Sequence, residues 1–186
     1  MTALLRRRLV AIAVLLGAAL AGAGAWLVVG HLVTPDGNAA AEKLFALHLP
    51  DSDGKTLAFA QWRGKPMVVN FWATWCPPCR EEMPLLDRVA RANPGIQFVG
   101  ISVDDKEHVA AFRSANPTSY PLPITGMDIS PLAAELGNKA MALPFTVFVS
   151  ADGTLKKVKL GALKEVELLQ LVAAIKPADQ ELKSAK

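Results

Sequence analysis

Cysteine is scarce in this sequence: only Cys76 and Cys79 occur among 186 residues. Disulfide-rich domains need several bridges between distant segments, so one closely spaced pair excludes that class. A structural zinc site needs four Cys or His ligands, yet none of the three histidines lies near the cysteines. A c-type haem needs histidine directly after the second cysteine, where Arg80 stands. We therefore expect no metal and no cofactor.

A strong charge of one sign is also lacking. The formal net charge is +3, and no basic stripe interleaved with aromatic residues occurs. Nucleic-acid-binding proteins carry such a basic footprint. Binding to nucleic acid is therefore not expected.

Charge is wholly absent from Leu9 to Val33, where no Asp, Glu, Lys or Arg occurs. This run exceeds the roughly 20 residues that a helix needs to cross a bilayer, and also the roughly 7–15 apolar residues of a signal peptide. Three arginines precede it, at positions 6–8, whereas Asp36 and Glu42 follow it. The positive-inside bias places the N-terminus in the cytoplasm and the remainder outside.

The chain is thereby predicted to have four parts. Residues 1–33 form a cytoplasmic tip and a transmembrane anchor, and residues 34–42 form a short polar linker. Residues 43–177 form one domain, large enough to bury a core, and residues 178–186 form a charged tail. Ala39-x-Ala41 leaves a cleaved signal sequence as the alternative to the anchor.

Strand and helix patterns alternate along the domain. Short apolar or alternating runs predict strands at 45–49, 56–59, 67–72, 96–103, 122–125, 145–149 and 155–160. Helical periodicity and end signals predict helices at 79–92, 107–115, 131–136 and 164–175. This order predicts an α/β domain with a mixed sheet covered on both faces. Asp104 and Asp105 are expected to end a strand in solvent, with no metal role.

The cysteine pair lies where a buried strand turns into a helix. At a helix N-terminus the unsatisfied N–H groups and the dipole stabilise a thiolate, which is the nucleophile of disulfide exchange. Pro77 and Pro78 suit a helix start but lack an N–H, so the donors to Cys76 must come from Cys79 onward. A structural disulfide closing this four-residue loop is worth only about 2 kcal/mol. Redox exchange is the favoured chemistry.

The segment Val69-Asn-Phe-Trp-Ala-Thr-Trp-Cys-Pro-Pro-Cys-Arg-Glu-Glu-Met-Pro84 resembles the TlpA/ResA group of membrane-anchored, thioredoxin-like thiol-disulfide oxidoreductases. The likeness extends from about Phe45 to Ile175 and includes Leu143-Pro144-Phe145-Thr146. It implies a thioredoxin-like fold with an added N-terminal β-hairpin. It also implies a central insertion at about Glu107 to Thr125.

The resemblance also implies residue roles. Cys76 is the attacking thiol and Cys79 the resolving one. Pro144 follows a cis peptide bond beside the cysteines, and the backbone at Leu143 pairs with an extended substrate segment. The substrate surface is completed by Trp75, Pro77 and Pro78. We expect Trp75 at its exposed rim and Trp72 buried.

Glu82 matches the active-site glutamate of that group and shares a helix face with Cys79. Thioredoxins proper have a buried Asp where Asn70 stands, and an amide cannot accept a proton. Glu82 is therefore the candidate acceptor for the Cys79 proton. The alternative is that Glu81 and Glu82 merely complement the helix N-terminus.

The expected function is reduction of protein disulfides outside the cytoplasm of a bacterium, from the inner membrane, with electrons from a membrane donor. Cytochrome c maturation and copper-centre assembly are the roles that the resemblance implies. An oxidant remains open, because the reduction potential and not the spacing sets direction. A thiol peroxidase is a second alternative, although Val69 and Ala73 replace the Pro and Thr of its Pro-x-x-x-Thr-x-x-Cys pattern. A binding domain with an inert pair is the third.

Overall fold

Two wholly buried strands form the centre of the sheet. The structure is a computed structural model, and it describes residues 35–176. Every residue of β3 (Met67–Trp72) and of β5 (Phe145–Val149) is buried. The two strands pair antiparallel, with Met67 opposite Val149 and Phe71 opposite Phe145. Both have the bounds predicted from their apolar runs, because a strand covered on both faces is apolar throughout.

The outer strands complete a mixed sheet of order β4-β3-β5-β6. β4 (Gln97–Ser102) runs parallel to β3, and β6 (Leu155–Leu160) runs antiparallel to β5. β6 is an edge strand that carries three lysines, at positions 156, 157 and 159. Charges of this kind on an edge oppose pairing with another chain.

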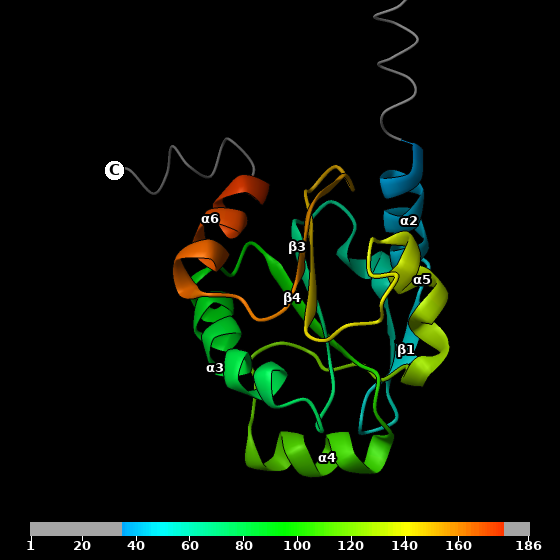
Figure 1. The fold of residues 1–186 in the computed structure, drawn as a ribbon, viewed down its shortest axis with the longest axis vertical. Coiled ribbons are helices and arrows are strands. Elements are labelled where there is room, and N and C mark those ends of the chain that lie inside the picture. The colour runs from blue at the N-terminus through cyan, green and yellow to red at the C-terminus, as the bar shows by residue number, and fades with distance from the viewer. Residues whose placement is uncertain (1–34, 177–186) are drawn as a thin grey trace, which may run out of the picture. The chain divides into compact units, whose positions relative to one another are not determined.

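Helices cover both faces of the sheet, as predicted. α3 (Pro77–Ala92) and α6 (Glu165–Ile175) lie on one side of it, and α2 (Pro35–Phe45) and α5 (Ser130–Glu135) lie on the other (Figure 1). α4 (Lys106–Ala115) lies across the end of the sheet where β3 leads into α3 (Figure 1). Two short 3-10 helices, η1 (Phe59–Trp62) and η2 (Gly126–Ile129), complete the elements.

The predicted N-terminal hairpin is confirmed as β1 (His48–Pro50) paired antiparallel with β2 (Thr56–Ala58), but the start predicted for its first strand is wrong, because Phe45 ends α2. Its turn is closed by Asp51, whose Oδ1 accepts hydrogen bonds from the backbone N–H groups of Asp53 and Lys55, both at 2.9 Å. Such side-chain-to-backbone bonds are the reason that Asp favours turns. The hairpin is a separate two-stranded sheet.

The linker predicted at residues 34–42 is wrong from Pro35 onward, because α2 occupies that segment. Pro is favourable in the first turn of a helix and Ala is the best helix former. Ala40, Ala41 and Leu44 have no exposed surface and belong to the buried core. The Pro-Asp-Gly-Asn sequence that indicates a turn is therefore outweighed by packing against the domain.

The strand predicted at residues 122–125 is also wrong. Only an isolated bridge joins Ile124 to Ser102. The segment lies beside β4, because the carbonyls of Pro121 and Pro123 accept from Gly100 and Ser102 at 3.0 and 2.8 Å. Prolines have no N–H to return these bonds, so a regular ladder cannot form.

The predicted anchor and tail, residues 1–33 and 178–186, lie outside the described residues. Among residues 35–176, no helix is long and apolar enough to cross a bilayer.

Candidate active site

The cysteine pair is built at the start of α3. Cys76 is the N-cap of that helix, and Pro77 and Pro78 form its first turn. A disulfide joins Cys76 to Cys79, with their Cα atoms 5.3 Å apart. Cys76 Sγ accepts a hydrogen bond from the Cys79 backbone N–H at 3.3 Å. This confirms the prediction that donation to the first sulfur begins at Cys79.

The two cysteines differ in exposure. Cys76 retains 4% of its surface, whereas Cys79 retains none. Both cysteines are therefore largely enclosed. The remaining difference still decides which sulfur an incoming molecule meets first, because only Cys76 has any exposed surface.

The loop before Cys76 is tied to the neighbouring strand by Asp104. Asp104 Oδ2 accepts hydrogen bonds from the Thr74 backbone N–H, at 3.2 Å, and from the Thr74 hydroxyl. The Asp104 side chain is only 8% exposed, so the prediction that it lies in solvent is wrong. Desolvation opposes its ionisation, but the bonds from Thr74 and from the Asp105 backbone hold the pKa of Asp104 below its usual range.

Sequence reasoning missed this contact although a signal for it exists. Asp104 follows β4 and Thr74 follows β3, and the two strands are parallel neighbours. The carboxyl ends of parallel strands meet at one edge of a sheet, so residues just beyond them are neighbours. Asp105, by contrast, is exposed and caps α4 by accepting from the His108 backbone N–H at 2.9 Å.

The tryptophans lie as predicted. Trp75 is 64% exposed and directly precedes Cys76, whereas Trp72 is fully buried. Trp72 Nε1 donates to the Gly100 carbonyl at 3.2 Å. The loop therefore presents one large apolar side chain to solvent beside the reactive sulfur.

Glu82 is buried in α3, about one helical turn after Cys79. It is 4% exposed, and its two oxygens accept hydrogen bonds from separate elements. Oε1 accepts from Asn70 Nδ2 at 2.8 Å, and Oε2 accepts from the Leu163 backbone N–H at 2.9 Å. Burial raises the pKa of Glu82 above its ordinary value, and the two hydrogen bonds oppose that rise.

This environment separates Glu82 from its neighbour. Glu81 is exposed, as a residue that merely complements a helix N-terminus would be. Glu82 is buried, and buried carboxyl groups with perturbed pKa values gather at functional sites. Asn70 also donates to Thr146 Oγ1 at 3.0 Å, while its own Oδ1 has no partner among the described residues.

The loop before β5 brings Pro144 into the buried core. The Leu143–Pro144 peptide bond is cis, as the resemblance implies. Asn138, which is 1% exposed, shapes the approach to this bond. Its amide donates to the Ala142 carbonyl at 2.9 Å and accepts from the Ala142 N–H at 3.0 Å. Sequence reasoning did not single out Asn138, and no pattern in the sequence indicates its partner.

The chain is similar to known proteins in sequence and in fold. The Redoxin family profile matches residues 30–175. A thiol-disulfide oxidoreductase ResA of Geobacillus thermodenitrificans is 29% identical over 132 residues, which are 69% of this chain and 74% of the relative. The soluble secreted antigen MPT53 of Mycobacterium tuberculosis is 34% identical over 151 residues, covering 80% and 85%.

A solved structure shows the same architecture. It is a secreted Mycobacterium tuberculosis disulfide oxidoreductase described as homologous to Escherichia coli DsbE. It is 30% identical, with a TM-score of 0.61, and the match covers 70% of this chain and 96% of that one. The α/β architecture is thus thioredoxin-like, with a mixed sheet and flanking helices.

Proposed function

The chain belongs to the Redoxin family and is a thiol-disulfide oxidoreductase, and on that premise we propose that it reduces disulfides of proteins outside the cytoplasm. One observation carries the assignment of roles within the pair. Cys76 caps α3 and keeps some exposed surface, whereas Cys79 is fully buried behind it. An incoming disulfide therefore reaches Cys76 and not Cys79.

The reaction consists of two exchanges. In the reduced enzyme, the Cys76 thiolate attacks one sulfur of the substrate disulfide, forms a mixed disulfide and displaces the other sulfur as a thiolate. The Cys79 thiolate then attacks Cys76, which releases the second substrate sulfur. The substrate gains two electrons and two protons, and the enzyme is left with the Cys76–Cys79 disulfide. A dithiol donor returns the two electrons by the reverse exchange.

Glu82 takes the proton of Cys79 in the second exchange. Cys79 is a thiol until the mixed disulfide forms, and a thiol must be deprotonated to attack. Glu82 lies one turn further along α3, and its raised pKa brings it closer to that of a thiol. Asn70 cannot accept the proton, but it orients the carboxyl group that does so.

The substrate segment lies over the rim formed by Trp75, Pro77 and Pro78, which are all exposed. It pairs with the backbone of Leu143, next to Pro144. Within residues 35–176 neither backbone polar group of Leu143 makes a hydrogen bond, so both are free for an added strand.

The charge-free run at residues 9–33 supports a location at the bacterial inner membrane, with the N-terminus in the cytoplasm and the catalytic domain on the outer side. The reducing equivalents then come from a membrane donor. Exported proteins with cysteine pairs are the substrates, including those of cytochrome c maturation and copper-centre assembly.

Capture of substrates tests the proposal. In a Cys79→Ser variant the mixed disulfide on Cys76 cannot be resolved, so we expect substrate proteins attached to it through a reducible bond. The matched Cys76→Ser variant should capture none. Equal capture by both variants would contradict the assigned roles.

The direction of electron transfer is tested by measuring the reduction potential of the purified chain in equilibrium with glutathione. A reductant has a potential well below that of DsbA, which is about −120 mV. A value near that of DsbA would make the chain an oxidant, and peroxide consumption that survives Cys79→Ser would make it a peroxidase.

A further inference from the structure

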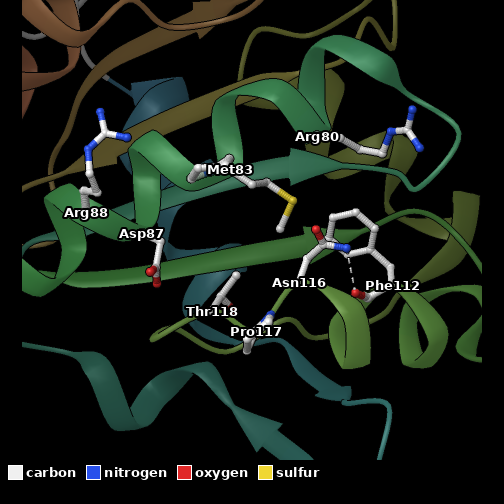
Figure 2. A pocket seen from close by; sticks show the side chains of 9 residues that line it. Arg80, Met83, Asp87, Arg88, Phe112, Asn116, Pro117 and Thr118 are labelled. Carbon is white, nitrogen blue, oxygen red and sulfur yellow. Dashed lines mark hydrogen bonds between the residues drawn. The ribbon is translucent and has the colours of Figure 1, made fainter.

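A cavity of about 340 Å³ lies between α3 and the segment that follows α4. Its floor is apolar and includes Met83 and Phe112, and Pro117 and Thr118 close its lower side (Figure 2). Met83 points from α3 toward Phe112 and Asn116 (Figure 2). The volume is in the range of ligand-binding clefts, about 300–1,000 Å³.

The cavity continues toward the reactive cysteines. A second hollow of about 290 Å³ shares Arg80, Phe112 and Asn116 with the first and reaches Pro77. Pro77 directly follows Cys76, the N-cap of α3. The two hollows share these residues and lie along α3; we call them together the α3–α4 groove, and Pro77, the residue after Cys76, lines one end of it.

The charged residues that line the groove are Arg80, Arg88, Asp87 and Glu81. Arg80 and Arg88 stand at the two ends of the larger cavity, and their guanidinium groups extend outward, away from Thr118 (Figure 2). The Arg80 side chain makes no hydrogen bond or ion pair with any described residue, whereas Arg88 forms an exposed ion pair with Glu165 at 3.6 Å. The carboxylate of Asp87 is already engaged, by Arg91 at 2.8 Å and by the Ser119 N–H.

We propose that the α3–α4 groove binds an extended segment of the substrate protein that carries an apolar side chain between acidic ones. The apolar side chain lies over Met83 and Phe112, and the carboxylates meet Arg80 and Arg88. This inference rests on the proposed function and deepens it, because it states which protein segments are presented to Cys76.

The spacing of the arginines sets the spacing of the acidic residues. At about 1.5 Å per residue, Arg80 and Arg88 are about 12 Å apart along the helix axis. An extended chain covers that distance in about four residues, at about 3.3 Å each. The segment is thus of the form Glu-x-Phe-x-Glu. The exposed Glu81 at the mouth of the smaller hollow disfavours further acidic residues next to the cysteine.

Activated peptide disulfides test the proposal. Each peptide begins with a cysteine that is linked by a disulfide to thionitrobenzoate. A short glycine spacer and the sequence Glu-Gly-Phe-Gly-Glu follow. A second series of peptides has the cysteine at the C-terminal end. In matched peptides Lys replaces both Glu residues, or Gly replaces Phe. At low salt, the reduced wild type should react about fivefold faster with the acidic than with the basic peptide. Loss of Phe should slow the reaction about tenfold.

Charge reversal supplies the control. An Arg80→Glu, Arg88→Glu variant should prefer the basic peptide, whereas two matched substitutions outside the groove, Lys156→Glu and Lys157→Glu, should leave the acidic preference intact. Because the preference is a ratio within one variant, changes in Cys76 reactivity cancel.

Equal rates for acidic and basic peptides, or a preference that survives charge reversal in the groove, would overturn the inference. Reduction of insulin disulfides by the wild type tests the proposed function separately. If only the groove proposal is wrong, the wild type still reduces insulin. If the proposed function is wrong, the wild type does not reduce insulin.

Discussion

At the scale of single residues, the site depends on carboxyl groups placed in opposite surroundings. Glu82 is buried and its pKa is raised by desolvation, whereas Asp104 keeps a lowered pKa because its hydrogen bonds outweigh its partial burial. The raised pKa makes Glu82 a better proton acceptor for a thiol, and the lowered pKa keeps Asp104 charged so that it holds the loop.

Glu82→Gln should slow release of substrate from the mixed disulfide by about 100-fold, because the general base is lost. The wild-type rate should rise with pH through the raised pKa of Glu82, and the variant should lack that rise. Stopped-flow measurement of the release step between pH 4 and 9 checks this. The matched Glu81→Gln variant alters an exposed neighbour and should follow the wild-type profile; a similar loss in both would point to a helix-end effect.

Glu82 also makes stability depend on pH. The pKa of Glu82 in the folded state lies above its ordinary value of 4.5. The contribution of protonated Glu82 to folding stability is therefore complete below pH 4.5 and is lost as the pH rises through the folded-state pKa. Urea unfolding of wild type and Glu82→Gln should therefore show the wild type losing stability relative to the variant above about pH 4.5.

Asp104→Asn should destabilise the fold by about 1.5–3 kcal/mol, because Thr74 loses a charged acceptor. The lowered pKa of Asp104 makes stability depend on pH in the opposite sense to Glu82. The stabilising contribution of Asp104 is present above pH 3.8, its ordinary pKa, and is lost as the pH falls through its folded pKa. Acid unfolding monitored by circular dichroism checks this. Asp128→Asn, at an exposed position, is the control; an equal effect there would contradict the role of the Thr74 contact.

At the scale of elements, α2 belongs to the domain. Leu44 is fully buried in the core, and Lys43 forms an ion pair with Glu135 of α5 at 2.7 Å. The helix thereby covers the face of the sheet opposite α3 and α6 (Figure 1).

Leu44→Ala should lower the free energy of unfolding by about 2–5 kcal/mol, since it leaves a cavity in the core. Lys43→Ala, which removes only an exposed ion pair, should cost less than about 1 kcal/mol. Urea denaturation of the two variants measures the difference. Wild-type stability in Leu44→Ala would mean that α2 is only a connecting segment.

The sequence predicted the elements whose own residues determine them. β3 and β5 have their predicted bounds because both faces of each strand are covered, and a strand of that kind is apolar along its whole length. α2 and the segment beside β4 depend on distant partners, so local turn and strand signals were misleading there. The same holds for the site: spacing identified Cys76 and Cys79, but the enclosure of Glu82 comes from Leu163, 81 positions away.

At the scale of the whole molecule, the proposed location depends on a segment outside the described residues. The charge-free run at residues 9–33 predicts export of the domain, and the family relatives include a secreted antigen. Oxidising compartments are where protein disulfides form and need reduction.

With alkaline phosphatase fused after Lys186 we expect high enzyme activity, and with green fluorescent protein fused there we expect no fluorescence, because the proposed topology places the C-terminal part outside the cytoplasm. Deletion of residues 9–33 should reverse both readouts. Fluorescence from the full-length fusion would place the domain in the cytoplasm.

The complete enclosure of Cys79 has a kinetic consequence. The electron donor that reduces the enzyme must attack the same sulfur, that of Cys76, as the substrate does. The donor and the substrate therefore compete for one site. Turnover then follows a ping-pong scheme, in which double-reciprocal plots at different donor concentrations are parallel and excess donor inhibits. The donor and the substrate react in turn at Cys76, and no ternary complex forms.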